Sequence, residues 1–335
     1  MANIAINGFG RIGRQVFKTI SAFFPEHNIV AVNDITNPET LVHLLRYDSN
    51  YGKYNKRIEL ISSDTFVVDG KKTKCLMYSD PANLPWRENE IDIVVESTGR
   101  FKSRVDASVH IRNGAKKVFV SAPMKDPDLT IVRGVNDDSY DPEKHQVISN
   151  ASCTTNSLAP IVNVLHKKYE VEFGFMTTIH SYTGDQRLLD APHTDMRRAR
   201  NAATNIVPTS TGAANSVGIV IPELAGKLTG ISVRVPTSTV SLTDFVCRLK
   251  EDIGVEQINA ELERASKFEL SGIIDYSEEP LVSSDYLGSP YSGTVDALST
   301  QVLGSHMLKI CIWYDNEWGY SVRSAEVVDM IAKSI

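Results

Sequence analysis

The sequence predicts an α/β protein with two domains: a Rossmann domain built on a doubly wound parallel sheet, and a second, α+β domain with a mainly antiparallel sheet. A glycine-rich turn stands between a strand-like run and a helix-like run near the start of the chain. Strands and helices then alternate, as they do in parallel sheets. Long strands with few helices follow, which favours antiparallel pairing. The length of 335 residues is in keeping with two domains.

The first element is a short strand over residues 2–7, followed by GFGRIG at residues 8–13. Apolar residues near helical spacing predict a helix over 11–24, and the run IVAVND predicts a strand over 29–34. On its own, G-x-G-x-x-G is compatible with a simple glycine turn. Together with both strands, the helix and a terminal acid, it is the full context of a dinucleotide-binding βαβ unit.

The residues of this unit have separate physical roles. Gly8 permits the tight turn, Gly10 lets a pyrophosphate approach the backbone, and Gly13 lets the helix pack on the strand. The helix N-terminus offers N–H groups to the phosphates. Asp34, about twenty residues beyond Gly13, would accept hydrogen bonds from ribose hydroxyls and repel a 2′-phosphate. The unit therefore predicts NAD in preference to NADP.

Further strands are predicted over 91–98, 116–123 and 145–152, with helical segments between them. In doubly wound sheets, ligands gather at the carboxyl ends of the strands. Polar residues that fall at or just past predicted strand ends are Asp34, Thr98, Ser121 and Cys153. Their shared position is the first indication that Cys153 lies near a binding site.

The second half of the sequence has a different pattern of predicted strands and helices. The predicted strands there are residues 171–180, 230–236, 239–249 and 307–315, with one clear helix over 255–266. The polar segment between His180 and Pro208 is long enough to be functional or an interface. Helical spacing over 319–335 predicts a last helix that packs back on the first domain. The predicted division is therefore 1–150 with 317–335, against 151–316.

Composition excludes several classes of function. A net charge of −6 and a pI near 5.8 do not favour nucleic acid or an anionic membrane as partner. No apolar run approaches the roughly 18 residues of a membrane span, and no signal-peptide pattern is found. The four cysteines are far apart and without C-x-x-C spacing, which argues against a metal site. Few thiols indicate a reducing compartment, so we expect a cytoplasmic protein.

Cys153 lies in SNASCTTN, residues 149–156, just ahead of apolar residues at helical spacing. It could be a buried structural cysteine, half of a disulfide, a metal ligand or a nucleophile; the composition weakens the disulfide and metal readings. A thiol at a helix N-terminus feels the positive end of the dipole, which lowers its pKa. His180, at the end of a long strand, is a candidate activating partner, although either residue could be structural.

The combination of a nicotinamide cofactor and an activated thiol narrows the chemistry. A thiolate adds to an aldehyde and gives a hemithioacetal, which releases hydride and becomes a thioester. His180 would take the proton, and the backbone N–H of Cys153 would help to stabilise the oxyanion. Thr183, the Arg197–Arg200 cluster, the run STGAA and Arg234 would supply cations and hydroxyls for phosphate. Solvated surface or a subunit contact is the alternative for the arginine cluster.

The motifs NGFGRIGR, ASCTTN, TTIHSYT, STGAA, RVPT and WYDNEWGY resemble, in this order, those of phosphorylating glyceraldehyde-3-phosphate dehydrogenases. The resemblance runs from residue 3 to the C-terminus. It implies oxidation of D-glyceraldehyde 3-phosphate to 1,3-bisphosphoglycerate with NAD and inorganic phosphate, in glycolysis or gluconeogenesis. It also implies a homotetramer in which the segment after His180 lines a neighbouring subunit's cofactor site, and makes 151–316 the catalytic domain.

The resemblance implies a role for each matching residue. Cys153 is the implied nucleophile and His180 its activator. The implied cofactor-binding residues are Gly8, Gly10, Arg11, Ile12, Gly13, Asp34, Ser79, Ser121 and, at the nicotinamide amide, Asn316. The implied residues of two anion sites, for substrate phosphate and inorganic phosphate, are Ser152, Thr154, Thr183, Arg198, Thr211, Gly212 and Arg234. Which of Arg197, Arg198 and Arg200 binds phosphate stays open.

Two rival functions remain at this stage. Erythrose-4-phosphate dehydrogenase has the same nucleophile but hydrolyses its thioester, and the anion-site residues favour the phosphorylating enzyme. A non-catalytic role in NAD or RNA binding would leave the Cys153–His180 pair unexplained. Ser79 stands where the family usually has arginine, at a contact made through the backbone. Pro192 matches the NAD-type loop, while Ala191 leaves weak NADP use open.

Overall fold

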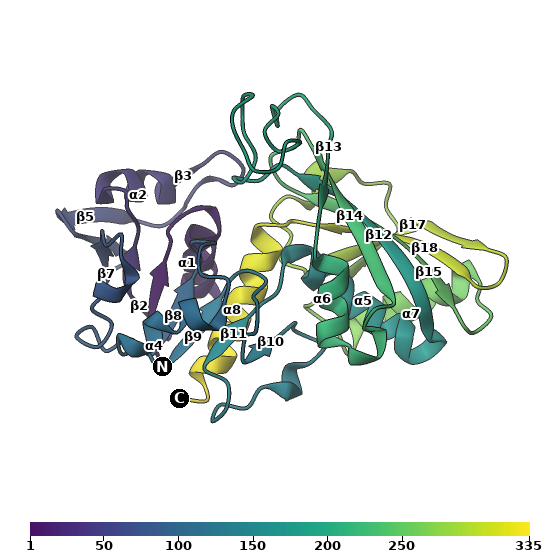
Figure 1. Ribbon diagram of the computed structural model, residues 1–335, viewed down its shortest axis with the longest axis horizontal. Coiled ribbons are helices and arrows are strands. Elements are labelled where there is room, and N and C mark those ends of the chain that lie inside the picture. The colour runs from purple at the N-terminus through teal and green to yellow at the C-terminus, as the bar shows by residue number, and fades with distance from the viewer. The chain divides into compact units, whose positions relative to one another are not determined.

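The computed structural model describes all 335 residues, which form two compact units. The first unit comprises Met1–Ile131, Asp138–Ala151 and Ser321–Ile335. The second comprises Val132–Asp137 and Ser152–Tyr320. Each unit is built on its own sheet, as Figure 1 shows by the labels of the strands. The predicted fold class is confirmed.

The first unit contains a nine-stranded sheet in the order β10-β11-β9-β8-β1-β2-β7-β6-β5. The strands are β1 (Asn3–Asn7), β2 (Asn28–Asn33), β5 (Ile58–Ser62), β6 (Thr65–Val68), β7 (Lys71–Leu76), β8 (Ile93–Glu96), β9 (Lys117–Val120), β10 (Leu129–Thr130) and β11 (Val147–Ser149). Strands β10 to β7 pair in parallel, and β6 and β5 add an antiparallel edge. Because β1 lies between β2 and β8, the strand order reverses there, which is where such sheets bind ligands.

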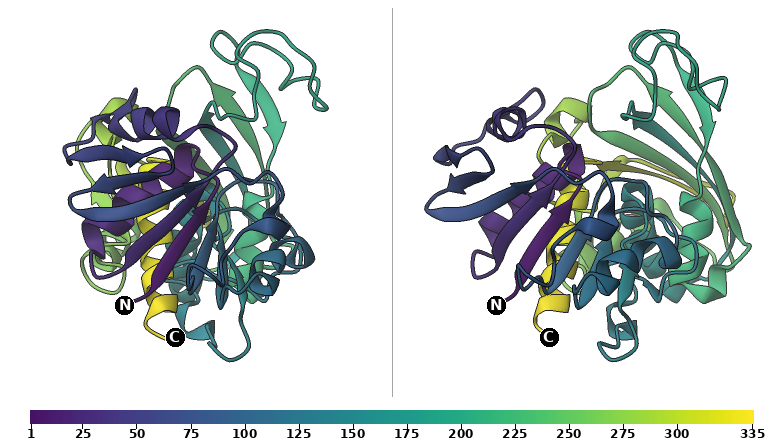
Figure 2. Two further views of the ribbon diagram at one scale, coloured as in Figure 1. Left: turned by 90° about the vertical axis from the view of Figure 1, so that its left-hand side faces the viewer. Right: turned by 60° about the vertical axis from the view of Figure 1, so that its left-hand side comes forward.

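Both faces of the central part of this sheet are buried, as a doubly wound fold requires. Ile4 and Ile6 of β1 pack in one apolar cluster with Val16 of α1 (Arg11–Phe23) and Val328 of α8 (Trp318–Ala332). Ala5 points to the opposite face and packs in a second cluster. Figure 2 shows the yellow C-terminal helix alongside the purple strands.

The remaining elements of the first unit are short. They are α2 (Pro38–Arg46), α3 (Arg104–Ala107), α4 (Val109–Arg112), the strand pair β3 (Tyr47–Asp48) and β4 (Gly52–Lys53), and the 3-10 turn Pro81–Asn83. Asn37 caps α2 by accepting a hydrogen bond from the Thr40 N–H at 2.9 Å, and Pro38 takes the first helical position. No helix of the chain is both long enough and apolar enough to cross a bilayer.

The second unit contains a seven-stranded sheet in the order β13-β14-β12-β15-β18-β17-β16. The strands are β12 (Val171–Ser181), β13 (Val207–Ser210), β14 (Leu228–Val235), β15 (Ser241–Leu249), β16 (Ile274–Ser277), β17 (Gly293–Leu303) and β18 (Met307–Tyr314). The pairs β12–β14 and β16–β17 are parallel and the other four are antiparallel. The helices are α5 (Cys153–Tyr169), α6 (Ala213–Val220) and α7 (Val255–Lys267), with 3-10 turns at Pro222–Leu224 and Ser283–Tyr286.

One face of this second sheet packs on helices and the other is open. Along β12, Gly174, Met176 and Thr178 are buried, whereas Phe173 and Phe175 between them are exposed. This period of two is that of a strand with one covered face. Residues 182–206 form a long loop that projects beyond the end of β12, in teal and green at the top of Figure 1.

Candidate active site

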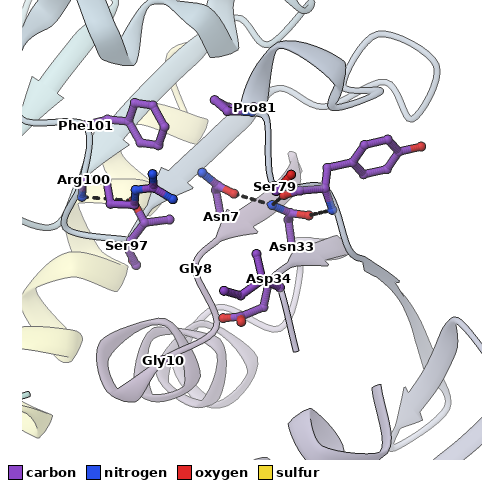
Figure 3. A pocket seen from close by; sticks show the side chains of 13 residues that line it. Asn7, Gly8, Gly10, Asn33, Asp34, Ser79, Pro81, Ser97, Arg100 and Phe101 are labelled. Atoms are coloured by element: carbon purple, nitrogen blue, oxygen red, sulfur yellow. Dashed lines mark hydrogen bonds between the residues drawn. The ribbon is translucent and has the colours of Figure 1, made fainter. Parts of the chain in front are cut away.

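A pocket of about 250 Å³ lies at the carboxyl ends of β1 and β2 in the first unit (Figure 3). Gly8, Gly10, Asp34 and Ser79 line it, all of them residues predicted for the cofactor. Thr98 lines it too, as expected for a residue just beyond a strand end. The pocket therefore lies where the βαβ unit predicts a dinucleotide.

The three glycines of the turn meet different constraints. Gly8 has φ +91°, and a Cβ there would lie 2.6 Å from the Thr98 nitrogen. A Cβ on Gly13 would lie 2.1 Å from the Gly8 carbonyl oxygen, so helix α1 packs tightly on the turn. A Cβ on Gly10 would meet nothing within 4 Å. Gly10 thus leaves an open cradle at the start of α1, which suits a pyrophosphate on the helix N-terminus.

Asp34 is held by the backbone of this turn. One carboxylate oxygen accepts a hydrogen bond from the Phe9 N–H at 2.9 Å, and the other accepts one from the Thr36 N–H at 3.2 Å. Its carboxylate remains at the pocket edge, as Figure 3 shows. A fixed anion at this point suits ribose hydroxyls and disfavours a 2′-phosphate.

A buried polar network holds two of the residues that line the pocket. Glu96, 1% exposed, accepts hydrogen bonds from Asn7 Nδ2 at 2.6 Å, from His110 Nε2 at 3.1 Å and from the Thr98 N–H at 2.7 Å. Trp86 Nε1 donates to His110 Nδ1 at 3.0 Å, which requires the His110 hydrogen on Nε2. The network fixes Asn7 and Thr98, two residues that line the pocket.

The other predicted cofactor residues of the first unit occupy varied positions. The Arg11 side chain pairs with Asp48 at 2.8 Å, which leaves its backbone to face the helix start. Ile12 is partly buried against the core. Ser79 is exposed at the pocket, and the Ser121 hydroxyl donates to the Glu96 carbonyl oxygen at 3.2 Å.

Cys153 and His180 meet in the second unit. Cys153 is the first residue of α5, and its Sγ lies 3.5 Å from His180 Nε2. Ser152 caps the helix, because its hydroxyl oxygen accepts the Thr155 N–H at 3.0 Å. His180 lies one residue before the end of β12 and is 5% exposed. The predicted thiol–imidazole pair is therefore formed across 27 residues of chain.

Burial favours the uncharged form of both groups of the pair in the protein without substrate. Burial and the Arg234 guanidinium lower the pKa of His180 to about 3. Burial raises the pKa of the Cys153 thiol; Arg234, the Thr154 hydroxyl and backbone N–H groups oppose this without reversing it. The expectation of a lowered thiol pKa is therefore wrong, because loss of solvation outweighs the helix N-terminus.

Arg234 joins this pair from the neighbouring strand. The parallel register of β12 and β14 places Arg234 opposite His180. Its Nη1 lies 2.7 Å from His180 Nδ1 and 3.1 Å from the Ser181 carbonyl oxygen. Its Nε is buried and has no hydrogen-bond partner. A guanidinium with unused donor capacity beside a thiol suits an anion.

Arg198 is the member of the arginine cluster that is linked to another predicted anion-site residue, Thr183, through Asp185. Its Nε donates to the Thr209 hydroxyl at 2.8 Å, and its Nη1 pairs with Asp185 at 2.7 Å. The Thr183 hydroxyl donates to the same Asp185. Arg200 instead pairs with the exposed Asp190 at 3.0 Å.

Thr211 and Gly212 form the start of α6. Gly212 is the N-cap residue, and the Thr211 hydroxyl oxygen accepts the Ala213 N–H at 3.2 Å. Arg198 Nη2 lies 3.4 Å from the carbonyl oxygen of Ser210, which directly precedes them. The guanidinium and the helix start therefore belong to one polar region.

Two predicted residues are engaged inside the protein. Thr154 is buried, and its hydroxyl lies 2.9 Å from the Tyr314 hydroxyl, which also lies 2.7 Å from the Thr178 hydroxyl. The Asn316 side-chain oxygen accepts hydrogen bonds from the hydroxyls of Ser181 and Ser241, each at 2.9 Å. This fixes the Asn316 amide so that its NH₂ group is turned away from those hydroxyls.

Sequence reasoning missed three residues of this site. Tyr314 stacks edge-on against His180, with ring centroids 6.1 Å apart, and Asp185 joins Thr183 to Arg198. The Ser181 carbonyl oxygen accepts from His180 Nδ1 or from Arg234. Tyr314 and Ser181 lie within the quoted motifs WYDNEWGY and TTIHSYT, so the signal was present; nothing in the pattern marked Asp185.

The glycine-lined pocket of one unit and the Cys–His pair beside an arginine in the other fit the class of nicotinamide-dependent dehydrogenases. Residues 2–104 match the NAD binding domain of Glyceraldehyde 3-phosphate dehydrogenase, and residues 152–316 match its C-terminal domain. The chain belongs to the glyceraldehyde-3-phosphate dehydrogenase family. Membership confirms the predicted NAD cofactor and the predicted class of enzyme.

Relatives cover almost the whole chain. Glyceraldehyde-3-phosphate dehydrogenase of Geobacillus stearothermophilus is 54% identical over 329 residues, which is 98% of each chain. Glyceraldehyde-3-phosphate dehydrogenase 1 of Bacillus subtilis is 53% identical over 330 residues, 98% of each chain. The second such enzyme of Bacillus subtilis is 49% identical over 98% of this chain and 96% of its own length.

Proposed function

We propose that this protein oxidises D-glyceraldehyde 3-phosphate with NAD and inorganic phosphate to 1,3-bisphosphoglycerate, in glycolysis or gluconeogenesis. The observation that carries the proposal is the 3.5 Å contact between Cys153 Sγ and His180 Nε2 beside Arg234. At this distance the imidazole can accept the thiol proton while the sulfur adds to an aldehyde. The arginine supplies the anion binding that a phosphorylated substrate needs.

Each residue of the site has a separate role in the proposed reaction. Cys153 Sγ forms a bond to the aldehyde carbon while His180 Nε2 takes the thiol proton. The N–H of Cys153, at the start of α5, faces the oxyanion that develops. NAD, when bound, would supply the hydride acceptor that converts the hemithioacetal on Cys153 into a thioester. A phosphate oxygen then displaces the thiol, and the acyl phosphate leaves. Gly8, Gly10, Gly13 and Asp34 hold the cofactor in this account.

The cofactor assignment includes Arg11 and Ile12 through their backbone, Ser79, Ser121 and, at the nicotinamide amide, Asn316. Support comes from the open cradle at Gly10, the pocket position of Ser79 and the fixed amide of Asn316. Residual NADP use is expected to be weak because the Asp34 carboxylate stands at the ribose position.

For the two anion sites we assign Thr183, Arg198 and Arg234 to direct contact, with Thr211 and Gly212 at the start of α6. The geometry around Arg198 supports its choice over Arg197 and Arg200. Ser152 and Thr154 complete the predicted set and act through the backbone of the first helical turn, since their hydroxyls are engaged in the protein.

We further propose a cytoplasmic homotetramer. The exposed face of the second sheet supports oligomerisation: the side chains of Phe173, Phe175 and Ile231 are 49%, 65% and 50% exposed. Four free cysteines support a reducing compartment. The proposed domain division, 1–150 with 317–335 against 151–316, is supported by the two compact units. Replacing Phe175 with Glu should lower the sedimentation coefficient; an unchanged tetramer would exclude this face as an interface.

The function is tested by NADH formation from glyceraldehyde 3-phosphate and NAD, with and without inorganic phosphate. We expect sustained turnover only with phosphate. Slow turnover indifferent to phosphate would favour hydrolysis of the thioester, and erythrose 4-phosphate would then be the substrate to test. The full-length relatives named above do not favour that alternative.

A further inference from the structure

A second pocket lies in the first unit, away from the cofactor pocket. It has a volume of about 190 Å³ and lies where β2 and β7 begin, beside the last turns of α1. The cofactor pocket lies at the opposite, carboxyl ends of β1 and β2, and the two pockets share no lining residue. Pockets for drug-sized ligands usually measure roughly 300–1,000 Å³, so an occupant of this one would be small. No residue proposed above for catalysis, cofactor or phosphate lines it.

The inner wall of this second pocket is apolar. Phe17 of α1, Ile29 of β2 and Val68 of β6 line it, and all three are buried. The Phe17 ring is held by two other rings, with its centroid 5.7 Å from that of Phe9 and 5.8 Å from that of Phe66. A fixed aromatic wall suits an aromatic ligand, which gains from edge-on or offset stacking as well as from burial.

One polar group of the wall has no partner in the protein. The hydroxyl oxygen of Tyr54, a lining residue, is buried and makes no hydrogen bond. The Lys18 ammonium lies 5.2 Å from the centroid of the Tyr54 ring and helps to hold it in place. Burial and the Asp69 carboxylate raise the pKa of Tyr54 to about 12, so the hydroxyl keeps its hydrogen. A buried donor without an acceptor costs free energy, and a ligand oxygen would relieve that cost.

Two ammonium groups give the pocket an excess of positive charge. Lys71 Nζ donates to the carbonyl oxygens of Pro25 and His27, the latter at 3.2 Å, which leaves one of its three hydrogens unused. Lys56 pairs with Asp69 at 2.9 Å, and Asp69 is the only carboxylate among the lining residues. The lining side chains therefore carry two ammonium charges against one carboxylate charge, which favours an anionic ligand.

Two further polar side chains of the wall are already engaged. His27 Nδ1 accepts the Ala2 N–H at 3.2 Å, and its Nε2 lies 3.1 Å from a carboxylate oxygen of Asp329. The Thr73 hydroxyl donates to the Ile29 carbonyl oxygen at 2.8 Å. These two side chains therefore offer no donor to a ligand, which leaves the tyrosine and the lysines for that role.

We propose that this second pocket binds a small aromatic carboxylate of about the size of benzoate. The aromatic ring of the ligand lies against Phe17, Ile29 and Val68, and its carboxylate accepts hydrogen bonds from Tyr54 and Lys71. The acid group matches the excess of positive charge and the ring matches the apolar wall, so neither part alone binds as well. The inference concerns binding only, and it does not depend on the proposed function.

The test is a titration of the full chain with 4-fluorobenzoate, followed by ¹⁹F NMR. The protein is first saturated with NAD and inorganic phosphate, so that the cofactor pocket and the proposed anion sites are filled. We expect saturable binding, competition by benzoate but not by acetate, and weaker binding of the uncharged 4-fluorobenzamide. No saturable binding up to about 10 mM 4-fluorobenzoate would overturn the proposal.

Variants place the ligand in this pocket. Tyr54→Phe should weaken binding about tenfold without loss of thermal stability, because the hydroxyl has no partner in the protein. Ser21→Phe should abolish binding, because the added ring would occupy the pocket that Ser21 lines. Lys71→Met should bind more weakly, whereas Lys72→Met, which changes an exposed lysine of β7 outside the pocket, should match the wild type. Undiminished binding by either Tyr54→Phe or Ser21→Phe would mean that the ligand lies elsewhere and would overturn the proposal.

Discussion

The two units of this protein make their binding sites in different ways. In the first unit, the residues proposed to hold the cofactor, Gly8, Gly10, Gly13 and Asp34, lie in one βαβ unit and would act mainly through backbone shape. In the second, Cys153, His180 and Arg234 come from α5, β12 and β14, and they meet through strand pairing and side-chain contacts. A site of the first kind is a local sequence motif. A site of the second kind depends on how strands that are far apart along the chain pair in the sheet.

Removing the proposed nucleophile should have the largest effect, because turnover should be lost while NAD binding is kept. Cys153→Ser should lower turnover by about 10⁴-fold or more, because a serine hydroxyl beside a neutral histidine is a far weaker nucleophile. NAD affinity, measured by calorimetry, should stay within about twofold, since no cofactor contact is assigned to Sγ. The control is Cys311→Ser, a half-buried thiol of β18. Turnover near the wild-type rate would exclude Cys153 as nucleophile.

Removing the base should have the next largest effect. His180→Asn should slow the NADH burst by about 10² to 10⁴-fold, because the thiol loses its proton acceptor. The pH profile of Cys153 alkylation by iodoacetamide should move to higher pH. His306→Asn, which changes a half-exposed histidine near Asp252, should match the wild type. The same alkylation profile in His180→Asn and wild type would show that His180 does not activate the thiol.

A methyl group in the glycine cradle tests the first unit alone. Gly10→Ala meets no atom within 4 Å and should fold normally, but its methyl should hold the pyrophosphate off the backbone and weaken NAD binding by about 10-fold or more. Gly254→Ala, at another helix start without a clash, is the matched control. Unchanged NAD affinity in Gly10→Ala would mean that the cofactor does not approach this turn.

The buried network under the pocket should make a smaller contribution. Glu96→Gln puts an NH₂ group where the carboxylate accepts only donors, so the positions of Asn7 and Thr98 should loosen. We expect the KM for NAD to rise about three- to tenfold with kcat nearly unchanged. Glu88→Gln, an exposed carboxylate of the same unit, is the control. Equal losses in kcat and NAD affinity would indicate general unfolding.

The smallest expected effect is on the free energy of unfolding in acid, and it arises from His180 in the second unit. The unfolded chain protonates histidine near pH 6.5, whereas the folded protein keeps the pKa of His180 at about 3. The unfolded state therefore binds more protons between these values, and folding stability falls as pH drops below about 6.5. Wild type should lose about 2 kcal/mol more than His180→Asn between pH 7.5 and 5. Urea unfolding at fixed protein concentration measures this, and equal losses would contradict it.

The sequence is sufficient to predict the fold class and the glycine-rich βαβ motif. It is less informative about several strands of the first sheet and about the contacts between side chains of the second unit. Strong periodicity predicts α1, β12 and α7 close to their observed ends. Strands β5, β6 and β7, at one end of the first sheet, escape prediction because few of their residues are buried: in KKTKCL, only Thr73 and Cys75 are buried. The pairing of His180 with Arg234 follows from the parallel register of β12 and β14, which spacing along the chain does not contain. Burial of the thiol, which reverses its expected pKa shift, is likewise a tertiary property.

In the proposed reaction, Cys153 carries the substrate as a thioester until phosphate attacks it. Rapid mixing of the NAD-loaded protein with glyceraldehyde 3-phosphate in phosphate-free buffer tests this most directly, followed by acid quench and mass spectrometry of the Cys153 peptide. We expect a burst of about one NADH per chain and an acyl group on Cys153 that disappears when phosphate is added. NADH formation without any acyl group on Cys153 would contradict it.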